Sequence, residues 1–156
     1  MKRYTYLVAD AHTRVQEIQP WDLSKLLVAG RELVLLDVRE PAEFAMLHIP
    51  GAINVPRGVL EQSCEWDFDE TVPLLAAGSG LEIVVVCRSG YRSALVADVM
   101  QQMGYTSVVS LRTGVRGWND FEQPLVDAVG NAVDGDIADE LLGPHLRPEQ
   151  RKPGTS

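Results

Sequence analysis

The sequence is poor in cysteine and in metal-binding histidine. It has two cysteines, Cys64 and Cys87, and three histidines in 156 residues. Two cysteines are too few for a disulfide-stapled fold or for a zinc site with four cysteine ligands. No pair of histidines has the helical or hairpin spacing of metal ligands. We therefore predict no metal and no other cofactor.

Long apolar runs and a surplus of basic residues are also lacking. No stretch approaches the roughly 20 apolar residues of a membrane span, and the start of the chain lacks the apolar segment of a signal peptide. The 14 basic residues are outnumbered by 22 acidic ones, which gives a net charge of −8. This balance argues against nucleic acid or a membrane surface as the main partner. We expect a cytoplasmic protein, because thiols stay reduced in that compartment.

What is present is the alternating pattern of an α/β domain. Apolar runs of strand length occupy residues 33–37, 52–55, 82–87 and 107–111. Segments with helical spacing occupy residues 20–30, 40–46, 57–62, 68–77, 93–103 and 115–121. This alternation predicts one domain with a mostly parallel central sheet flanked by helices.

The two ends of the chain carry weaker signals. We assign residues 1–19 to an N-terminal arm, within which residues 4–9 form a short strand or pack loosely. The main domain covers residues 20–124. Residues 125–156 form an extension that is partly mobile, because a segment with hairpin or loose-helix character is followed by a proline-containing tail from residue 143.

The residues after the strand at 82–87 carry the chemistry. Cys87 ends that strand, at the edge of the sheet where ligands bind in open α/β folds. A tight loop with Gly90 at positive φ would turn backbone N–H groups toward the sulfur, and Ser93 is placed to cap the next helix. Arg88 and Arg92 add positive charge, so the loop favours a thiolate and an anionic ligand. A buried apolar role for Cys87 is the alternative, but two arginines are poor packing material.

The segment VVVCRSGYRS resembles the active-site loop of the rhodanese family of sulfurtransferases. Residues 37–44 and 48–56 are similar to the family's upstream signature, and residues 104–118 to its closing region. The resemblance runs from about residue 20 to 121. It departs from the family at Leu47 and Val115, where glycines are common, and these two positions concern turn geometry. It implies a rhodanese-like three-layer α/β domain in a single-domain, thiosulfate sulfurtransferase-like protein.

The resemblance also implies a mechanism. A Cys87 thiolate takes the outer sulfur of a small anionic donor such as thiosulfate and becomes a persulfide. A thiophilic acceptor, which is a thiol, a protein cysteine or cyanide, then removes that sulfur, so the kinetics are ping-pong. The groups expected to bind substrate and persulfide belong to Arg88, Ser89, Gly90, Tyr91, Arg92 and Ser93.

Two alternative functions are less well supported by the sequence. A binding or regulatory module without turnover would have no physical need for Cys87 and its complete loop. A phosphatase or arsenate reductase of related fold is disfavoured by loop length. Four residues separate Cys87 from Arg92, whereas dual-specificity phosphatases have five. The oligomeric state is left open.

Several residues near these motifs have competing interpretations. Asp37 and Arg39 follow a strand, where they order the active loop or pair with Glu40 or Glu43. We interpret them as structural, with a supporting role behind the loop.

Three further side chains have a structural and a functional interpretation. Cys64 is an ordinary loop or helix cysteine or a resolving partner of Cys87, and we favour the former. His48 is a structural residue or a base for Cys87, and again the structural role is favoured. Trp118 is expected in the core.

Overall fold

The computed structural model describes residues 1–154. Its strands form one five-stranded sheet in the order β1-β5-β4-β2-β3, and every described pair is parallel. The strands are β1 (Gln16–Ile18), β2 (Val34–Asp37), β3 (Ile53–Asn54), β4 (Glu82–Val86) and β5 (Ser107–Leu111). The parallel sheet expected from the apolar runs is confirmed.

Eight α-helices connect or flank these strands within the described residues. They are α1 (Tyr4–His12), α2 (Pro20–Val28), α3 (Pro41–Met46), α4 (Leu60–Ser63), α5 (Pro73–Ala77), α6 (Tyr91–Gln102), α7 (Gly114–Asp120) and α8 (Gly135–Leu142). Short 3₁₀ turns occur at η1 (Arg57–Val59) and η2 (Pro148–Gln150). Proline begins α2, α3 and α5, where its fixed φ suits the first turn and its missing N–H costs no hydrogen bond.

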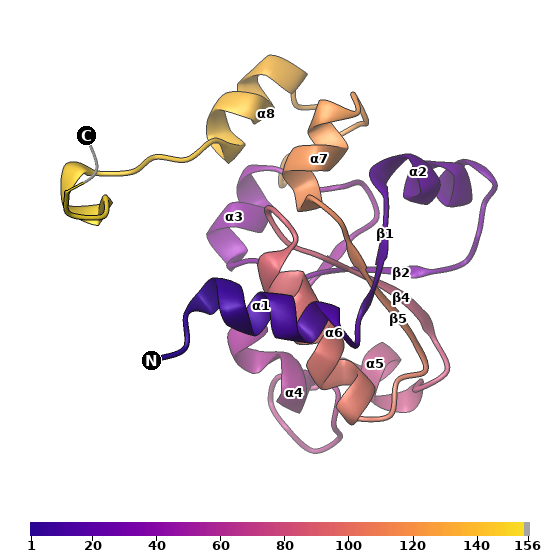
Figure 1. The fold of residues 1–156 in the computed structure, drawn as a ribbon. Helices are drawn as coiled ribbons and strands as arrows, with labels where there is room; N and C mark the ends of the chain where they lie inside the picture. The colour runs from indigo at the N-terminus through magenta and orange to yellow at the C-terminus, as the bar shows by residue number, and fades with distance from the viewer. Residues whose placement is uncertain (155–156) are drawn as a thin grey trace.

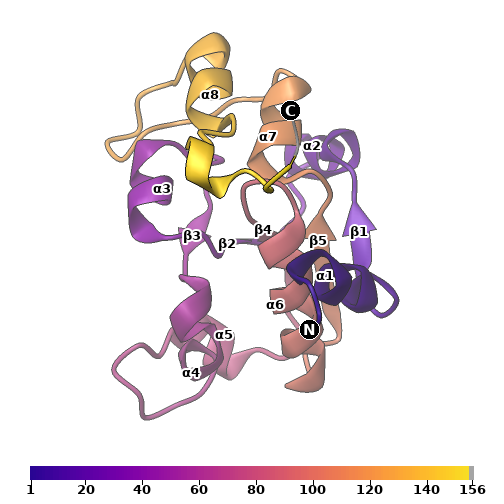
Figure 2. The same ribbon diagram turned by 60° about the vertical axis from the view of Figure 1, so that its left-hand side comes forward.

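Side chains of β4 alternate between the two faces of the sheet. Ile83 and Val85 belong to a core shared with α4, α5 and α6, whereas Val84 and Val86 belong to a core shared with α2, α7 and α8. These helices lie on opposite sides of the sheet (Figures 1 and 2). The three-layer α/β architecture is therefore confirmed, and β4 is buried on both faces.

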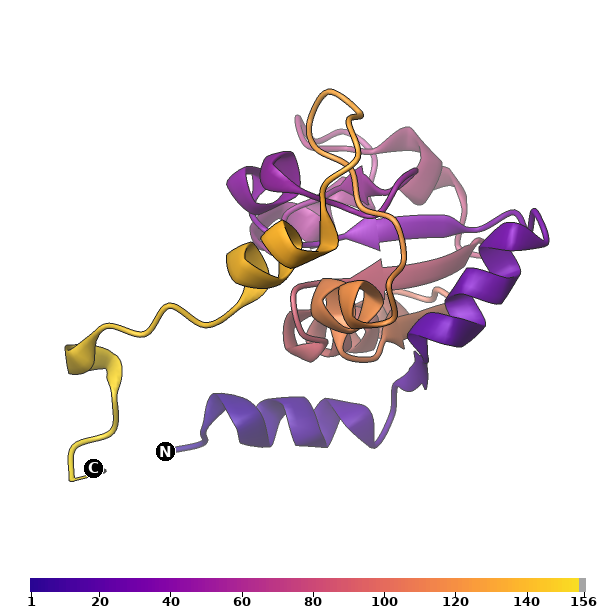
Figure 3. The same ribbon diagram turned by 90° about the horizontal axis from the view of Figure 1, so that it is seen from above.

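The N-terminal segment differs from expectation. Residues 4–9 are neither a strand nor a loose arm, because α1 is a helix that rests on α6 with Val8 and Ala11 buried. Figure 3 shows α1 as a separate helix beside the sheet domain. Arg14 then joins Asp98 of α6 through two hydrogen bonds of 2.9 Å. One side of α1 is buried by contact with α6, which is distant in the sequence. The local sequence pattern therefore did not indicate the helix.

Strand β1 follows α1 and pairs with β5 at the sheet's edge. The sheet therefore begins before residue 20, although the division of the chain at residues 20 and 124 stays a prediction. None of the helices within residues 1–154 is long and apolar enough to cross a membrane.

The C-terminal segment contains both structures that the sequence left open. Val126 forms antiparallel bridges with His48 and with Ala132, and α8 follows. Asp134 caps α8, and Leu142 is buried against the core. Part of the tail predicted to be mobile, residues 155–156, lies outside the described residues.

Candidate functional site

Cys87 directly follows β4, in the middle of the sheet. Because all described strands are parallel, their carboxyl ends share one edge, and the register places Asp37 of β2 beside Val86. Ser110 of β5 lies beside Val85 on the other side of β4. Cys87 is 1% exposed. The topology therefore places the thiol at the edge where α/β folds bind ligands.

The sulfur of Cys87 is surrounded by hydrogen-bonding groups. The backbone N–H groups of Gly90 and Ser93 donate to Sγ over 3.1 and 3.3 Å. The Ser93 Oγ lies 3.3 Å from Sγ and 2.8 Å from the Ser110 Oγ. These donors stand at the N-terminus of α6, whose dipole also favours negative charge. The surroundings are those of a sulfur anion.

The two serine hydroxyls can serve both charge states of the sulfur. In the thiol, S–H donates to Ser93 Oγ, which leaves the Ser93 hydrogen for Ser110. When the thiolate forms, both hydroxyls can rotate, so that Ser110 donates to Ser93 and Ser93 donates to Sγ. The anion then has three donors without any backbone movement.

The start of α6 corrects one sequence expectation. The N-cap residue is Gly90, at φ 93°, and α6 begins at Tyr91. Ser93 therefore lies inside the first turn and does not cap the helix. Its hydroxyl is engaged by the sulfur and by Ser110 instead. A side chain at Gly90 would also press against the backbone nitrogen of Thr113, 3.2 Å from an added Cβ.

The first turn of α7 holds the other side of the loop. Val115 N–H donates to the carbonyl of Cys87 over 2.9 Å, and Arg116 N–H donates to that of Arg88 over 3.0 Å. This close approach needs Gly114, which has φ 61° and whose added Cβ would overlap the Cys87 carbonyl oxygen. The family's second glycine is not required here, because the Val115 side chain is buried in the core.

Arg92 and Glu43 form a two-pronged ion pair at the edge of the site. Arg92 Nη1 lies 2.8 Å from Glu43 Oε2, and Nη2 lies 2.9 Å from Oε1. The hydrogen bonds from Arg92 hold the pKa of Glu43 below its usual value, and the same pairing raises the pKa of Arg92. One of the two predicted positive charges is therefore compensated. Within residues 1–154, Arg88 has no side-chain ion pair.

Asp37 and Arg39 pair with each other and not with Glu40 or Glu43. Both are fully buried, and Arg39 Nη2 lies 2.8 Å from Asp37 Oδ2. The same nitrogen donates to the carbonyl of Leu47 over 2.7 Å. The pair fixes the segment that follows β2. It reaches the active loop only indirectly, because the residue between them, Val38, donates its N–H to the carbonyl of Val86.

The remaining candidates lie in the interior or against α3. Cys64 is a buried free thiol, and burial raises its pKa. His48 stacks on Phe44 with 3.8 Å between ring centroids, and its Nδ1 lies 2.8 Å from the Phe44 carbonyl oxygen. Both contacts hold the His48 ring against Phe44 of α3. Trp118 is buried, as expected, and its indole N–H donates to the Pro124 carbonyl.

Two cavities flank the active loop. One, of about 460 Å³, is lined by Arg92 and Arg57, by the carboxylates of Glu40 and Glu61, and by apolar side chains of α6. The other, of about 290 Å³, is lined by Ser89, Gly90 and Tyr91 opposite Arg112 and Glu17. Residues of the loop thus border a cavity on each side.

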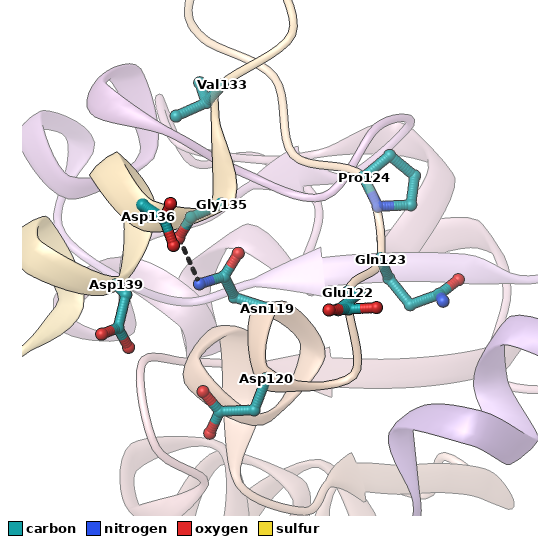
Figure 4. A pocket seen from close by; sticks show the side chains of 9 residues that line it. All are labelled: Asn119, Asp120, Glu122, Gln123, Pro124, Val133, Gly135, Asp136 and Asp139. Atoms are coloured by element: carbon teal, nitrogen blue, oxygen red, sulfur yellow. Dashed lines mark hydrogen bonds between the residues drawn. The ribbon is translucent and has the colours of Figure 1, made fainter.

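A further cavity lies elsewhere, between α7 and α8, with a volume of about 640 Å³. No residue of the Cys87 loop lines it. Figure 4 shows its acidic lining, which comprises Asp120, Glu122, Asp136 and Asp139. Such a charge opposes an anionic sulfur donor.

Sequence reasoning missed three contacts around the loop. Ser110 left a weak signal, as a polar residue within the apolar strand SVVSL. The partnership of Glu43 with Arg92 left none, because the two are 49 residues apart. Tyr4 of α1, whose ring meets that of Tyr91, comes from a segment with no recognised pattern.

Comparison with known proteins agrees with this geometry. Residues 20–121 match the model of a rhodanese-like domain. A sulfurtransferase from Allochromatium vinosum is 30% identical over 116 residues, which are 74% of this chain and 99% of that protein. The human single-domain sulfurtransferase TSTD1 has a TM-score of 0.60 at 28% identity, covering 68% of this chain and 96% of that one.

A second solved structure carries a different suggestion. A protein of unknown function from Rhodopseudomonas palustris, described as a possible tyrosine phosphatase, has a TM-score of 0.73 at 26% identity. The likeness covers 80% of this chain and 94% of that one. The family match itself contains β2 to β5 and the complete Cys87 loop. On this ground the chain belongs to the rhodanese-like family, in its sulfurtransferase class.

Proposed function

We propose that the protein moves a sulfane sulfur from a small anionic donor such as thiosulfate to a thiophilic acceptor, through a persulfide on Cys87. The observation that carries the proposal is the placement of Sγ between the N–H groups of Gly90 and Ser93, at 3.1 and 3.3 Å. A buried sulfur with such donors is prepared for negative charge. Both states of the reaction need that property, because thiolate and persulfide are anions.

The reaction consists of two nucleophilic displacements. The Cys87 thiolate attacks the outer sulfur of thiosulfate, the S–S bond of the donor breaks, and sulfite leaves with the bonding electron pair. The enzyme then carries a persulfide anion. An acceptor such as cyanide attacks its terminal sulfur, thiocyanate leaves, and the Cys87 thiolate is restored. No general base is needed, because neither displacement by an anion requires a proton to be removed.

Arginines without an ion-pair partner in residues 1–154 support an anionic donor, namely Arg57 in one cavity and Arg112 in the other. Glu40 and Glu61 also line the first cavity and Glu17 the second, and the charge of Arg92 is balanced by Glu43. The body of the protein is acidic, with a net charge of −8. A small anion can enter between these side chains, whereas a long polyanion would meet repulsion from the surrounding surface. We therefore propose no nucleic-acid partner.

Phosphate-ester hydrolysis is the competing function, because a solved neighbour is described as a possible tyrosine phosphatase. Two features speak against it here. The loop places four residues between Cys87 and Arg92. The guanidinium of Arg92 is already paired on both terminal nitrogens with Glu43, so it is not free to grip a phosphoryl group.

The experiment measures sulfur transfer and its intermediate in the same samples. Wild type, Cys87→Ser and the matched control Cys64→Ser are incubated with thiosulfate, and intact mass is recorded before cyanide is added. We expect the mass of one added sulfur atom in wild type and Cys64→Ser, followed by thiocyanate release. Cys87→Ser should give neither.

The proposal is overturned if wild type gains no sulfur from thiosulfate, from mercaptopyruvate or from inorganic polysulfide. Hydrolysis of p-nitrophenyl phosphate that depends on Cys87 would favour the phosphatase instead. The natural acceptor proposed is a thiol or a protein cysteine, and the proposed compartment is the reducing cytoplasm.

A further inference from the structure

Helix α1 lies outside the residues that match the family model, yet it reaches the active loop. The matched segment begins at residue 20, whereas α1 spans Tyr4–His12. The helix runs alongside α6, the helix whose N-terminus faces the sulfur (Figures 1 and 2). Its first turn therefore places a side chain at the mouth of the site.

That side chain is Tyr4. Its ring meets the edge of the Tyr91 ring, with 5.8 Å between centroids and 70° between planes. Tyr91 follows Gly90, whose N–H donates to the sulfur of Cys87. The Tyr4 side chain is 47% exposed, and within residues 1–154 its hydroxyl has no hydrogen-bond partner. An unused donor thus stands in solvent beside Tyr91, which lines the smaller of the two cavities at the loop.

The position of Tyr4 is fixed by the rest of α1. Val8 and Ala11 are 3% and 1% exposed beneath the helix. Past the C-terminal end of α1, Arg14 donates two hydrogen bonds of 2.9 Å to Asp98 of α6. The hydrogen bonds from Arg14 also hold the pKa of Asp98 below its usual value. A helix held along its length presents Tyr4 in a defined place.

The electrostatic surroundings of Tyr4 are those of the sulfur site. Partial burial raises the pKa of its hydroxyl, and the charge of Cys87 raises it further. Arg92 and Arg57 act in the opposite direction. The hydroxyl therefore stays protonated at neutral pH and remains a donor.

We propose that Tyr4 is a substrate-binding residue of the sulfur site, whose hydroxyl donates a hydrogen bond to the anionic end of the sulfur donor. For thiosulfate, the acceptor atom is a sulfonate oxygen, and the outer sulfur points toward Cys87. This inference rests on the proposed sulfurtransferase function and adds the residue that orients the donor. The sulfonate leaves as sulfite, so the hydrogen bond serves the first half-reaction only.

Ping-pong kinetics allow the two half-reactions to be measured separately. The kcat/KM for thiosulfate reports the loading of free enzyme, and the kcat/KM for cyanide reports the unloading of the persulfide. Tyr4→Phe keeps the ring against Tyr91 and removes only the hydroxyl. Loss of one hydrogen bond to a charged group predicts a fall of about tenfold in kcat/KM for thiosulfate. The value for cyanide should stay within about twofold.

The matched control is Tyr6→Phe, on the same helix. Tyr6 is 53% exposed, and its ring lies under Lys2 Nζ at 5.4 Å, so it has no role in the site. Circular dichroism and thermal unfolding verify that both variants keep the fold. We expect Tyr6→Phe to match wild type for both substrates.

Three outcomes overturn the inference. The first is a kcat/KM for thiosulfate in Tyr4→Phe equal to that of wild type. The second is an equal loss in Tyr4→Phe for thiosulfate and for cyanide, and the third is the same loss for thiosulfate in Tyr6→Phe. If wild type transfers sulfur and Tyr4→Phe does so equally well, only the substrate-binding role of Tyr4 is refuted. Wild type that never acquires sulfur refutes the sulfurtransferase function, and this inference with it.

Discussion

Arg92 and Glu43 lie 49 residues apart in the sequence and face each other in a two-pronged ion pair, with N–O distances of 2.8 and 2.9 Å. Glu43 Oε2 also accepts the N–H of Glu40 over 2.9 Å. The carboxylate therefore ties the start of α3 to the first turn of α6. An arginine in such a fork positions the loop, and its charge is already balanced before substrate arrives.

The first prediction concerns the coupling of these two residues. Arg92→Ala and Glu43→Gln should each lower the rate of persulfide formation, because each releases the loop from α3. The double variant should be scarcely worse than either single one, since the same contact is lost. In denaturant unfolding, the double-mutant cycle should give a coupling of about 1 kcal/mol, as expected for a half-exposed pair.

Additive losses in that cycle would contradict a positioning role. They would mean that Arg92 binds substrate independently of Glu43. The surface pair of Arg31 with Glu82, which has a 3.0 Å contact, supplies a control, because it is remote from the loop. Its cycle should leave persulfide formation unchanged.

The second prediction concerns Gly114. An alanine there must adopt φ near 61° and overlaps the Cys87 carbonyl oxygen. Gly130 is the matched control, with φ 84° and no atom within 4 Å of an added Cβ. Gly130→Ala should cost only the left-handed strain of about 1 kcal/mol. Gly114→Ala should cost about 3 kcal/mol and slow persulfide formation, because the clash adds to the strain. Equal costs in urea unfolding would contradict the close approach of α7 to the loop.

The sequence predicts the central strands of the sheet better than the segments at its edge. Strands such as β4 are continuous apolar runs whose burial on both faces follows from composition alone. The helix α1 escaped detection, because its buried residues Val8 and Ala11 face α6, more than eighty residues away in the chain. Strand β1 escaped because three residues carry too little pattern.

The candidate site shows the same division. The Cys87 loop is contiguous, so its N–H donors and Gly90 could be anticipated from local backbone physics. Partners supplied by other elements could not be anticipated. Glu43, Ser110 and Tyr4 reach the loop only through the tertiary fold. The alternative in which Arg39 pairs with Glu43 is not the one observed, because Arg39 pairs with Asp37 and Glu43 with Arg92.

The third prediction concerns the buried pair of Asp37 and Arg39. Asp37→Ala leaves the Arg39 guanidinium buried without its charge partner, because Arg39 is 1% exposed. The free energy of unfolding should fall by about 3–5 kcal/mol. The activity of the molecules that remain folded should change little, since the pair reaches the loop only through Val38. Loss of sulfur transfer in a variant with unchanged stability would instead give Asp37 a direct role.

The fourth prediction follows the pH dependence of the Glu43 pair. The pKa of the Glu43 carboxyl in the folded protein lies below the ordinary value of 4.5, because Arg92 donates to the carboxylate. The pair therefore contributes its full stability above pH 4.5 and loses it as the pH falls through the lower folded value. Wild type should exceed Glu43→Gln in stability at pH 7, and the difference should vanish in acid. A difference that grows on acidification would show the opposite sign of the pKa shift.

The last prediction tests the serine relay behind the sulfur. While Ser93 donates to a Cys87 thiolate, its own oxygen can accept from the hydroxyl of Ser110, whose Oγ lies 2.8 Å away, and this strengthens Ser93 as a donor. Ser93→Ala removes one donor from the anion and should slow iodoacetamide alkylation of Cys87 at pH 7 by about tenfold. Ser110→Ala removes only the supporting hydroxyl, so its effect should be smaller but in the same direction.

The relay is measured in a Cys64→Ser background, so that Cys87 is the only thiol. The discriminating variant is the double alanine. If the two hydroxyls act as one chain, removing Ser110 has no further effect once Ser93 is gone. Equal and additive losses from the two serines would show that the hydroxyls act independently and not as one chain. Unchanged alkylation in both single variants would leave the backbone N–H groups of Gly90 and Ser93 as the donors on which the sulfur depends.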